Sequence, residues 1–363
     1  MLKKVQIFKA LDIEIKKQKG PVMAKDAYRG HHSLKEELSQ PGISIIAETA
    51  GGSPLRGKVR DSYRASTHAK SLVENGANAI SVATDRFLFY GEDKHLSEVR
   101  SVVKVPLLRR DFIFEEYQIE ESKILGADGV ILMAYLLETD RLTALQELAR
   151  SKNLDVVVEV ASEDDIKRAL DVGADIVCVL GRDLDTWQPD WGMALSLLEK
   201  IPQNKCIRLL ESGICNISQI QQLEQMGVHG VIIGDVLLDE FYPGKRLAQI
   251  LAGAENQKKH TKLKGQNISL QTSHNKVNKS CKAPVREGRT IGSALITKQE
   301  HKQNSTTTPI IDKNGKLKVK KKATTIKKPI IKKAVASKSS ATVATKGETQ
   351  IKKVATSKVT AKK

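Results

Sequence analysis

The feature that most constrains the fold is a junction that occurs four times. In each copy a helix-like segment ends at a glycine and a short apolar strand follows: ENGANAI (74–80), ILGADGV (124–130), DVGADIV (171–177) and QMGVHGV (225–231). Glycine closes a helix because it adopts positive φ without a steric penalty, and the chain can then turn into the next strand. Repetition of this junction predicts a chain built from successive β-α units.

Short apolar runs rich in β-branched residues recur between the helical patterns. There are eight: SIIAE (44–48), AISVA (79–83), PLLR (106–109), GVILM (129–133), DVVVEV (155–160), DIVCVL (175–180), IRLLE (207–211) and GVIIG (230–234). They are continuous rather than alternating, which is typical of parallel strands covered by helices. Eight β-α units in about 210 residues predict an α/β fold, a (β/α)8 TIM barrel. A doubly wound open sheet is the alternative, but the G-x-G-x-x-G fingerprint expected after its first strand is absent.

Composition divides the chain into three parts. Residues 1–40 are expected to form an N-terminal helical extension that covers the bottom or the mouth of the barrel, and residues 41–255 the barrel itself. Residues 256–363 contain 28 Lys and Arg against 4 Asp and Glu, a net charge of +24, so the net charge of 1–255 is −6. This Lys-rich segment lacks Phe, Tyr and Trp and predicts a disordered basic tail.

The charge of the tail indicates a polyanionic partner. Nucleic acid, an acidic protein or an anionic membrane surface would attract it. Of these partners we expect nucleic acid in particular, bound without sequence preference. Sequence-specific recognition is not expected, because the tail has no aromatic side chain on which a base could stack. The alternative is a solvating segment with no single partner.

We place the chain in the cytoplasm. Its cysteines show no metal-ligand spacing, and no transmembrane segment is expected because no apolar run approaches the roughly 18 residues needed to cross a bilayer. The N-terminus also lacks the apolar core of a signal peptide.

Charged residues follow several of the expected strands. In a (β/α)8 barrel the active site lies where the strands end, so these side chains are expected to meet in one mouth. They are Glu48, Arg109, Arg110, Asp111, Glu159, Arg182, Glu211 and Asp235. Carboxylates in a pocket can act as acids or bases, and arginines with glycine turns after the last strands can hold a phosphate. Trp187 and Trp191, on the loop after the sixth strand, are expected to pack rather than to stack on a ligand.

Several phrases in this order resemble indole-3-glycerol-phosphate synthases. They are AE…SP (47–54), ISVATDRFLFYG (80–91), VPLLRRDFIFEEYQIEESKILGADGVILM (105–133), VVVEV (156–160), GRDL (181–184) and ESGI (211–214). The resemblance covers about residues 40–240. It implies a (β/α)8 barrel of tryptophan biosynthesis, a carboxy-lyase that closes the pyrrole ring of 1-(2-carboxyphenylamino)-1-deoxyribulose 5-phosphate with loss of carbon dioxide and water. It implies neither a metal nor an organic cofactor.

The resemblance also assigns site residues by position. It implies catalytic roles for Glu48, Arg110, Glu159 and Glu211, and substrate or phosphate binding by Ser53, Phe89, Phe112, Arg182, Ser212, Gly213 and Gly234. Phe89 and Phe112 match the aromatic walls of the anthranilate pocket, whereas Ser53, Gly213 and Gly234 match phosphate contacts.

The chain departs from the family where proton transfer is expected. Ala50 stands where the family has a lysine that binds the substrate carboxylate, and Arg110 replaces the lysine that acts as general acid. Leu180 and Gly181 replace two asparagines, and Leu55 replaces a serine. Arginine retains its proton and is a poor general acid, so we expect impaired or altered activity.

Three interpretations remain open from the sequence. The chain is a synthase with a slow or altered site, in which Arg56 or Arg60 could substitute for the missing lysine at position 50. Alternatively, it is a non-catalytic barrel that binds a phosphorylated ligand and is tethered to a polyanion by its tail. A different isomerase or lyase on a related barrel is the third interpretation.

Overall fold

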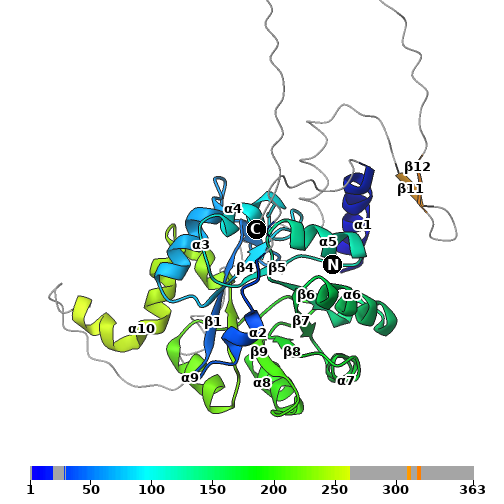
Figure 1. The fold of residues 1–363 in the computed structure, drawn as a ribbon. Coiled ribbons are helices and arrows are strands. Elements are labelled where there is room, and N and C mark those ends of the chain that lie inside the picture. Colours follow the sequence, from blue (N-terminus) through cyan, green and yellow to red (C-terminus); the bar gives the residue numbers. More distant parts are fainter. Residues whose placement is uncertain (1, 19–27, 29, 262–308, 312–316, 320–363) are drawn as a thin grey trace, which may run out of the picture. The chain divides into compact units, whose positions relative to one another are not determined.

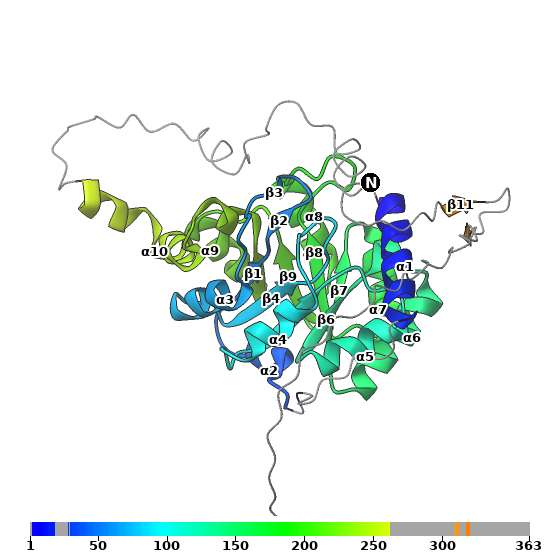
Figure 2. The same ribbon diagram turned by 90° about the horizontal axis from the view of Figure 1, so that it is seen from above.

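The computed structural model describes residues 2–18, 28, 30–261, 309–311 and 317–319 of the chain. Eight parallel strands form a closed barrel in the order β1-β10-β9-β8-β7-β6-β5-β4 (Figures 1 and 2). Their bounds are β1 Ser44–Thr49, β4 Ala79–Ala83, β5 Leu107–Arg110, β6 Gly129–Met133, β7 Asp155–Val160, β8 Ile176–Leu180, β9 Ile207–Glu211 and β10 Gly230–Ile233. The expected (β/α)8 barrel is confirmed, and each strand coincides with one of the eight apolar runs.

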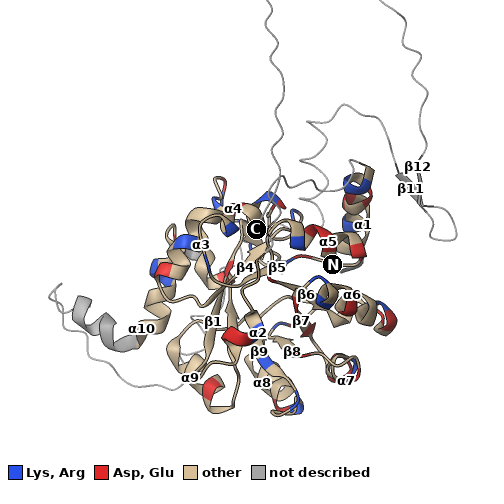
Figure 3. Ribbon diagram, viewed as in Figure 1, with Lys and Arg blue, Asp and Glu red and all other residues tan. Residues whose placement is uncertain are grey.

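A helix follows each barrel strand and lies outside the sheet (Figure 1). These helices are α3 Ala65–Glu74, α4 Lys94–Arg100, α5 Glu116–Ile124, α6 Thr139–Ser151, α7 Glu163–Asp171, α8 Trp191–Lys200, α9 Ile217–Gln225 and α10 Pro243–Thr261. Residues of both charge signs occur along outer helices such as α6 and α7 (Figure 3). The side chains of Ser162 and Asn216 cap α7 and α9 by accepting a backbone N–H three residues on.

The four junction glycines have the backbone that the sequence pattern requires. Gly76, Gly126, Gly173 and Gly227 all have positive φ, between 68° and 104°. A residue with a Cβ would be strained at each, so glycine ends the helix and lets the chain enter the following strand.

Two apolar clusters follow from the alternation of side chains along the strands. One fills the barrel and includes Ile46, Leu108, Ile131, Val157 and Leu209. The other lies between the strands and the surrounding helices, and contains the alternate strand residues such as Ile45 and Val158. A strand residue therefore faces the barrel interior or the helices according to its parity.

The N-terminal extension contributes one helix to each end of the barrel. Leu34 and Leu38 of α2 (Leu34–Leu38) are buried in the interior cluster, and the backbone N–H of Leu34 donates to Asp155 at the start of β7 (2.7 Å). Helix α1 (Leu2–Gln18) instead packs near α5, and its Lys9 pairs with Asp111, which directly follows β5. The extension thus closes the bottom with α2 and reaches the mouth with α1.

Several short elements lie in the loops at the mouth of the barrel. Strands β2 (Gly52–Ser53) and β3 (Gly57–Lys58) form an antiparallel hairpin after β1. The 3-10 turns η1 (Ala134–Leu136) and η2 (Asp235–Asp239) follow β6 and β10.

The chain comprises two units, residues 1–288 and residues 289–363. In the second unit, β11 (Pro309–Ile311) pairs antiparallel with β12 (Leu317–Val319), in a segment for which the sequence predicts no structure. The rest of the predicted disordered tail beyond Thr261 lies outside the described residues, and α10 itself continues past the expected boundary at residue 255. None of the described helices is long and apolar enough to cross a membrane.

Candidate active site

Four charged side chains converge at the mouth of the barrel. Glu48, Arg110, Glu159 and Glu211 come from β1, β5, β7 and β9, and each lies at or near the C-terminal end of its strand. Arg110 shares its parity with Leu108 of the interior cluster, whereas Arg109 points outward toward α5. Because successive strand residues point to opposite faces of the sheet, Arg110 belongs to the site whereas its neighbour Arg109 supports the structure outside the barrel.

Arg110 is the centre of this group. Its guanidinium lies 2.5 Å from an oxygen of Glu159, 2.5 Å from one of Glu211 and 3.6 Å from one of Glu48. Its side chain is only 2% exposed, and its guanidinium carbon lies 5.3 Å from the centre of the Phe89 ring. Burial alone would lower the pKa of Arg110, but the three glutamates more than offset it and raise that pKa well above its usual value. The guanidinium is thus permanently protonated and held by carboxylates.

The two glutamates that Arg110 holds most closely differ in their environments. Burial favours the neutral form of Glu159, but Arg110 first, then Glu211 and Tyr135, outweigh it and lower its pKa. Burial raises the pKa of Glu211 well above its ordinary value, and its Oε2 finds no donor among the described residues. Divergent pKa values of neighbouring carboxyls separate a base from an acid, so Glu159 suits the first role and Glu211 the second.

Tyr135 is a site residue that the sequence reasoning missed. It lies in η1, directly after β6, and its hydroxyl donates to Oε2 of Glu159 at 2.5 Å. Arg110 and Tyr135 together therefore satisfy both oxygens of Glu159. Its position after a strand end is the signal that could have identified it, since each βα loop contributes to the mouth.

A second group of residues lies beside this cluster, after β8, β9 and β10. Arg182 donates to the Ser212 hydroxyl (2.8 Å) and to the carbonyl of Trp187 (2.8 Å), and it pairs with Asp235. Ser212 and Gly213 both have positive φ, 78° and 76°. A non-glycine residue in this conformation costs of the order of 1–3 kcal/mol and is found preferentially at functional sites.

Close packing at Gly234 brings this second group against the first. A Cβ at Gly234 would lie 2.9 Å from a carboxylate oxygen of Glu48, so glycine leaves room for the Glu48 side chain beside the end of β10. Burial raises the pKa of Glu48, although Arg110 opposes the change.

The stretch 50–58, which follows β1, contains the β2–β3 hairpin and closes one side of the mouth. The amides of Gly51 and Gly52 donate to the carbonyl of Phe89 (3.0 and 3.2 Å), and a Cβ at Gly52 would lie 2.2 Å from the carbonyl oxygen of Gly57. Ala50 is buried and packs in the interior cluster. These contacts make the stretch a structural closure of the mouth, with Ser53 as its polar contribution.

Arg56, in the turn of the hairpin, and Arg60, just after it, contact the residues that follow β10. Arg56 donates to the carbonyl of Asp235 (3.0 Å), and Arg60 donates to the carbonyls of Leu237 and Glu240. Leu180, at the end of β8, is fully buried and offers neither charge nor hydrogen bond. Positions 50 and 180, where the resemblance implies a lysine and an asparagine, therefore carry apolar side chains.

These residues surround a pocket of about 370 Å³, open solvent included. Its lining consists of Glu48, Ser53, Pro54, Leu55, Phe89, Arg110, Arg182, Trp187, Glu211, Ser212, Gly234 and Asp235. Eight of the eleven sequence-predicted site residues are among them. Glu159 and Phe112 lie directly behind, in contact with Arg110 and Phe89, and Gly213 follows Ser212. Trp187, expected only to pack, also lines the pocket.

The described part of the chain contains no group of three or more His, Cys, Asp or Glu side chains arranged to hold a metal ion. The site chemistry available from the described residues is therefore that of carboxylates, arginines, hydroxyls and a phenol.

Comparison with known proteins gives a consistent result. The family model described as indole-3-glycerol phosphate synthase matches residues 2–249. A protein of that name from Thermoanaerobacter sp. (strain X514) is 38% identical over 235 residues, which cover 63% of this chain and 89% of the relative. One from Campylobacter jejuni subsp. doylei is 36% identical over 231 residues, 64% of this chain and 87% of the relative. The match begins in α1, so it includes the N-terminal extension as well as the barrel.

Proposed function

The chain belongs to the indole-3-glycerol phosphate synthase family, and on that premise we propose that it carries out the ring-closing reaction of tryptophan biosynthesis with an impaired or altered site. The substrate would be 1-(2-carboxyphenylamino)-1-deoxyribulose 5-phosphate, which loses carbon dioxide and water as the pyrrole ring closes. The enzyme would act as a carboxy-lyase in the cytoplasm, without a metal or organic cofactor.

The observation that carries the proposal is the position of Arg110 among three glutamates. Ring closure needs a proton delivered to the ketone oxygen that becomes the leaving hydroxyl, and a cation beside that oxygen stabilises its developing charge. Arg110 can supply the cation in a fixed fork, but it cannot supply the proton at any accessible pH. Glu211, whose pKa is raised, is the nearby group suited to donate it.

The same geometry explains why the rate should be low. The two guanidinium nitrogens of Arg110 that could form a bidentate contact with substrate already hold Glu159 and Glu211. At position 50 an alanine replaces the expected carboxylate anchor, and at position 180 a leucine replaces a hydrogen-bond donor. Loss of a general acid alone typically costs about 10²–10⁴ in rate.

Binding of the phosphate is assigned to the second group of residues. Of these residues, Ser212 and Gly234 line the pocket, Gly213 follows Ser212, and Arg182 donates to the Ser212 hydroxyl; Ser53 of β2 lines the same pocket and is assigned to the phosphate with them. Phosphate groups bind after the last strands in many barrels of this type. Phe89 lines the pocket and Phe112 lies behind it with ring centres 6.1 Å apart, so the two would form an aromatic wall against the aryl ring.

The test is a turnover assay that follows formation of indoleglycerol phosphate by its fluorescence. We compare the wild type with the triple variant Ala50→Lys, Arg110→Lys, Leu180→Asn, which restores the expected lysines and asparagine. The control is Arg208→Lys, the same substitution at a buried arginine whose side chain donates to backbone carbonyls at the other end of β9. A slow wild type, a gain of about 10²-fold or more in the triple variant and no gain in the control would support the proposal.

Two other results would contradict it. A triple variant no faster than the wild type would show that Arg110 is not the cause of a low rate. Failure of both proteins to turn over, with saturable binding of inorganic phosphate by calorimetry, would favour the non-catalytic ligand-binding barrel.

We further propose that residues 256–363 bind nucleic acid or another polyanion without sequence preference. The support is the net charge of +24 in this segment, set against −6 in the first 255 residues. Charge neutralisation of phosphates releases counterions, so the affinity for duplex DNA should fall steeply with salt.

A further inference from the structure

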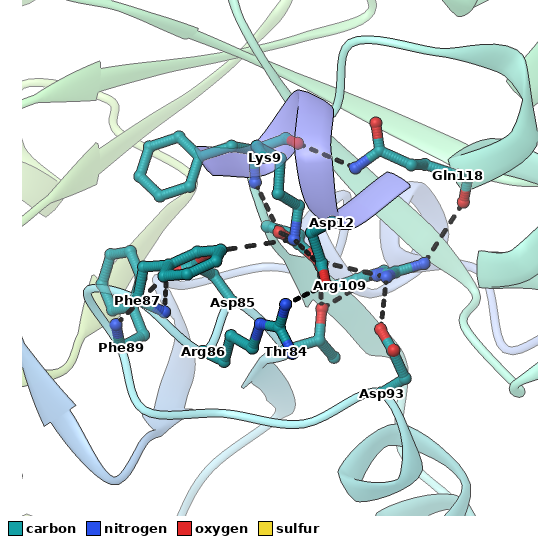
Figure 4. A network of polar contacts seen from close by, with 12 residues as sticks. Lys9, Asp12, Thr84, Asp85, Arg86, Phe87, Phe89, Asp93, Arg109 and Gln118 are labelled. Atoms are coloured by element: carbon teal, nitrogen blue, oxygen red, sulfur yellow. Dashed lines mark hydrogen bonds and ion pairs between the residues drawn. The ribbon is translucent and has the colours of Figure 1, made fainter. Parts of the chain in front are cut away.

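Lys9 is a buried cation that the site described above does not use. It lies on α1 with a side chain only 1% exposed, and its Nζ is 2.5 Å from Asp111, 3.9 Å from Asp85 and 3.8 Å from Asp12 (Figure 4). Burial would lower the pKa of this lysine, but Asp111 and Asp85 more than offset the effect and raise it. The ammonium is therefore charged and reaches from the N-terminal helix to two carboxylates of the barrel.

The first of these carboxylates holds the loop that carries Phe89. Oδ2 of Asp85 accepts hydrogen bonds from the backbone N–H groups of Phe87 (3.0 Å), Leu88 (2.7 Å) and Phe89 (3.4 Å). Its Oδ1 has no hydrogen-bond donor among the described residues, and Lys9 is the cation that faces it. The position of Phe89 thus depends on a carboxylate that Lys9 neutralises.

The second carboxylate lies between two residues of the site. Asp111 separates Arg110 from Phe112 in the sequence, and its Oδ1 accepts from the backbone N–H of Phe112 (2.8 Å). Its Oδ2 accepts from Thr84 (2.6 Å) and from Arg109 (3.0 Å). Lys9 therefore reaches the backbone of the second aromatic wall as well.

Other residues of α1 contact the same loop. Phe8 stacks on Phe87 with ring centres 5.4 Å apart, and Asp12 pairs with Arg86 at 2.6 Å. Figure 4 shows Lys9 and Asp12 of this helix facing Asp85, Arg86 and Phe87. Phe8, Lys9 and Asp12, on two successive turns of α1, thus all contact the segment that ends in Phe89.

We propose that Lys9 is a positioning residue of the pocket: by pairing with Asp85 and Asp111 it sets the placement of Phe89 and Phe112, so that docking of α1 tunes recognition of an aryl ligand. The placement of both rings thus depends on one ammonium group, although the rings lie on different loops. The inference rests on the proposed function only in naming an aryl group as the ligand of this wall. The placement of the rings themselves can be tested without any activity.

The test uses ¹⁹F NMR of the full chain labelled with 4-fluorophenylalanine, which gives six signals because the chain has six phenylalanines. Signals of Phe89 and Phe112 are assigned by Phe→Leu variants. We expect Lys9→Met to shift both signals beyond their linewidth and to leave that of Phe241, which is 78% exposed, in place. Lys9→Arg, which keeps the charge, should restore both shifts toward the wild type.

Two matched variants make the outcome specific. Lys16→Met removes another cation of α1, one that pairs with Asp93 (2.6 Å), Glu121 (3.5 Å) and Asp12 (3.8 Å) rather than with Asp85 or Asp111, and it should leave the signals of Phe89 and Phe112 unchanged. Asp85→Asn retains an oxygen for the loop amides but removes the charge that faces Lys9, so it should shift Phe89 and spare Phe112. Asp85→Asn also keeps the test decisive if Lys9→Met does not fold.

Ligand binding gives the second readout. Calorimetry with anthranilate as the aryl probe should show about a tenfold loss of affinity in Lys9→Met, whereas affinity for inorganic phosphate should stay within about twofold. Equal losses for both probes, equal effects of Lys9→Met and Lys16→Met, or unmoved fluorine signals in Lys9→Met would overturn the inference. If the fluorine signals of Phe89 and Phe112 shift in Lys9→Met but the wild type shows no turnover, the inference about Lys9 is supported and only the proposed function is contradicted.

Discussion

Replacement of Arg110 by methionine should destabilise the barrel. It should also reverse the direction in which the contribution of Glu159 to the free energy of unfolding changes with pH. Methionine fills a similar length but removes the only charge within 2.5 Å of both Glu159 and Glu211 among the described residues. Removing one partner of a buried ion pair typically costs about 3–5 kcal/mol, because the remaining charge is left without compensation. We therefore expect a loss of about 3–5 kcal/mol in the free energy of unfolding at pH 8.

The sign of the pH effect follows from the direction of the pKa shift. In the wild type the pKa of Glu159 is lowered, so its contribution to stability is present above its unfolded pKa and is lost as pH falls. Without Arg110, burial raises the pKa of Glu159 against the smaller opposing effects of Glu211 and Tyr135, and stability then increases as pH falls through the raised value. One proton bound across two pH units is worth up to about 2.7 kcal/mol, at 1.36 kcal/mol per unit.

The assay is urea denaturation of the wild type and Arg110→Met at pH 8 and pH 6. The control is the double variant Arg110→Met, Glu159→Gln, in which a neutral amide replaces the isolated carboxylate and can still accept from Tyr135. The difference from wild type should shrink at pH 6 for the single variant and change much less for the double variant. An equal loss at both pH values in the single variant would refute the view that uncompensated charge, rather than packing, sets the cost.

The remaining predictions concern other residues. Tyr135→Phe should cost about 1.5–3 kcal/mol in the urea assay because it removes a hydrogen bond to a charged group, whereas Tyr63→Phe, which loses a neutral bond to Thr49 (2.8 Å), should cost about 0.5–1.5 kcal/mol. Similar losses would contradict the ionised state of Glu159. Burial, with a smaller effect of Arg60, lowers the pKa of His68 to about 4, so its contribution to stability is present above pH 6.5 and is lost as pH falls toward 4. His68→Gln should therefore flatten acid unfolding in that range, and an unchanged slope would disprove the assignment. Deleting residues 262–363 should leave the melting temperature nearly unchanged and abolish duplex DNA binding; a large drop, or binding that persists in high salt, would contradict the predicted tail.

The sequence alone predicted the architecture because the barrel is a repeated local pattern. Each strand is a short apolar run, and four of the αβ junctions contain a glycine with positive φ, so the repeat is visible in the sequence. The same reasoning located the site at the strand ends, and parity along a strand would have separated Arg109 from Arg110. Glu48, Arg110 and Glu211 were predictable for this reason, since one edge of the barrel brings all strand ends together.

Only the tertiary structure decided what those residues do to one another. That Glu159 is held by two donors and Glu211 by one depends on contacts between β5, β6, β7 and β9, which no local pattern encodes. The burial of Lys9 between Asp85 and Asp111 likewise joins residues about 75 and 100 positions apart, and no helical period indicates it. Secondary structure follows from local backbone and side-chain preferences, whereas electrostatic pairing in a dry pocket depends on distances that exist only once the chain has closed.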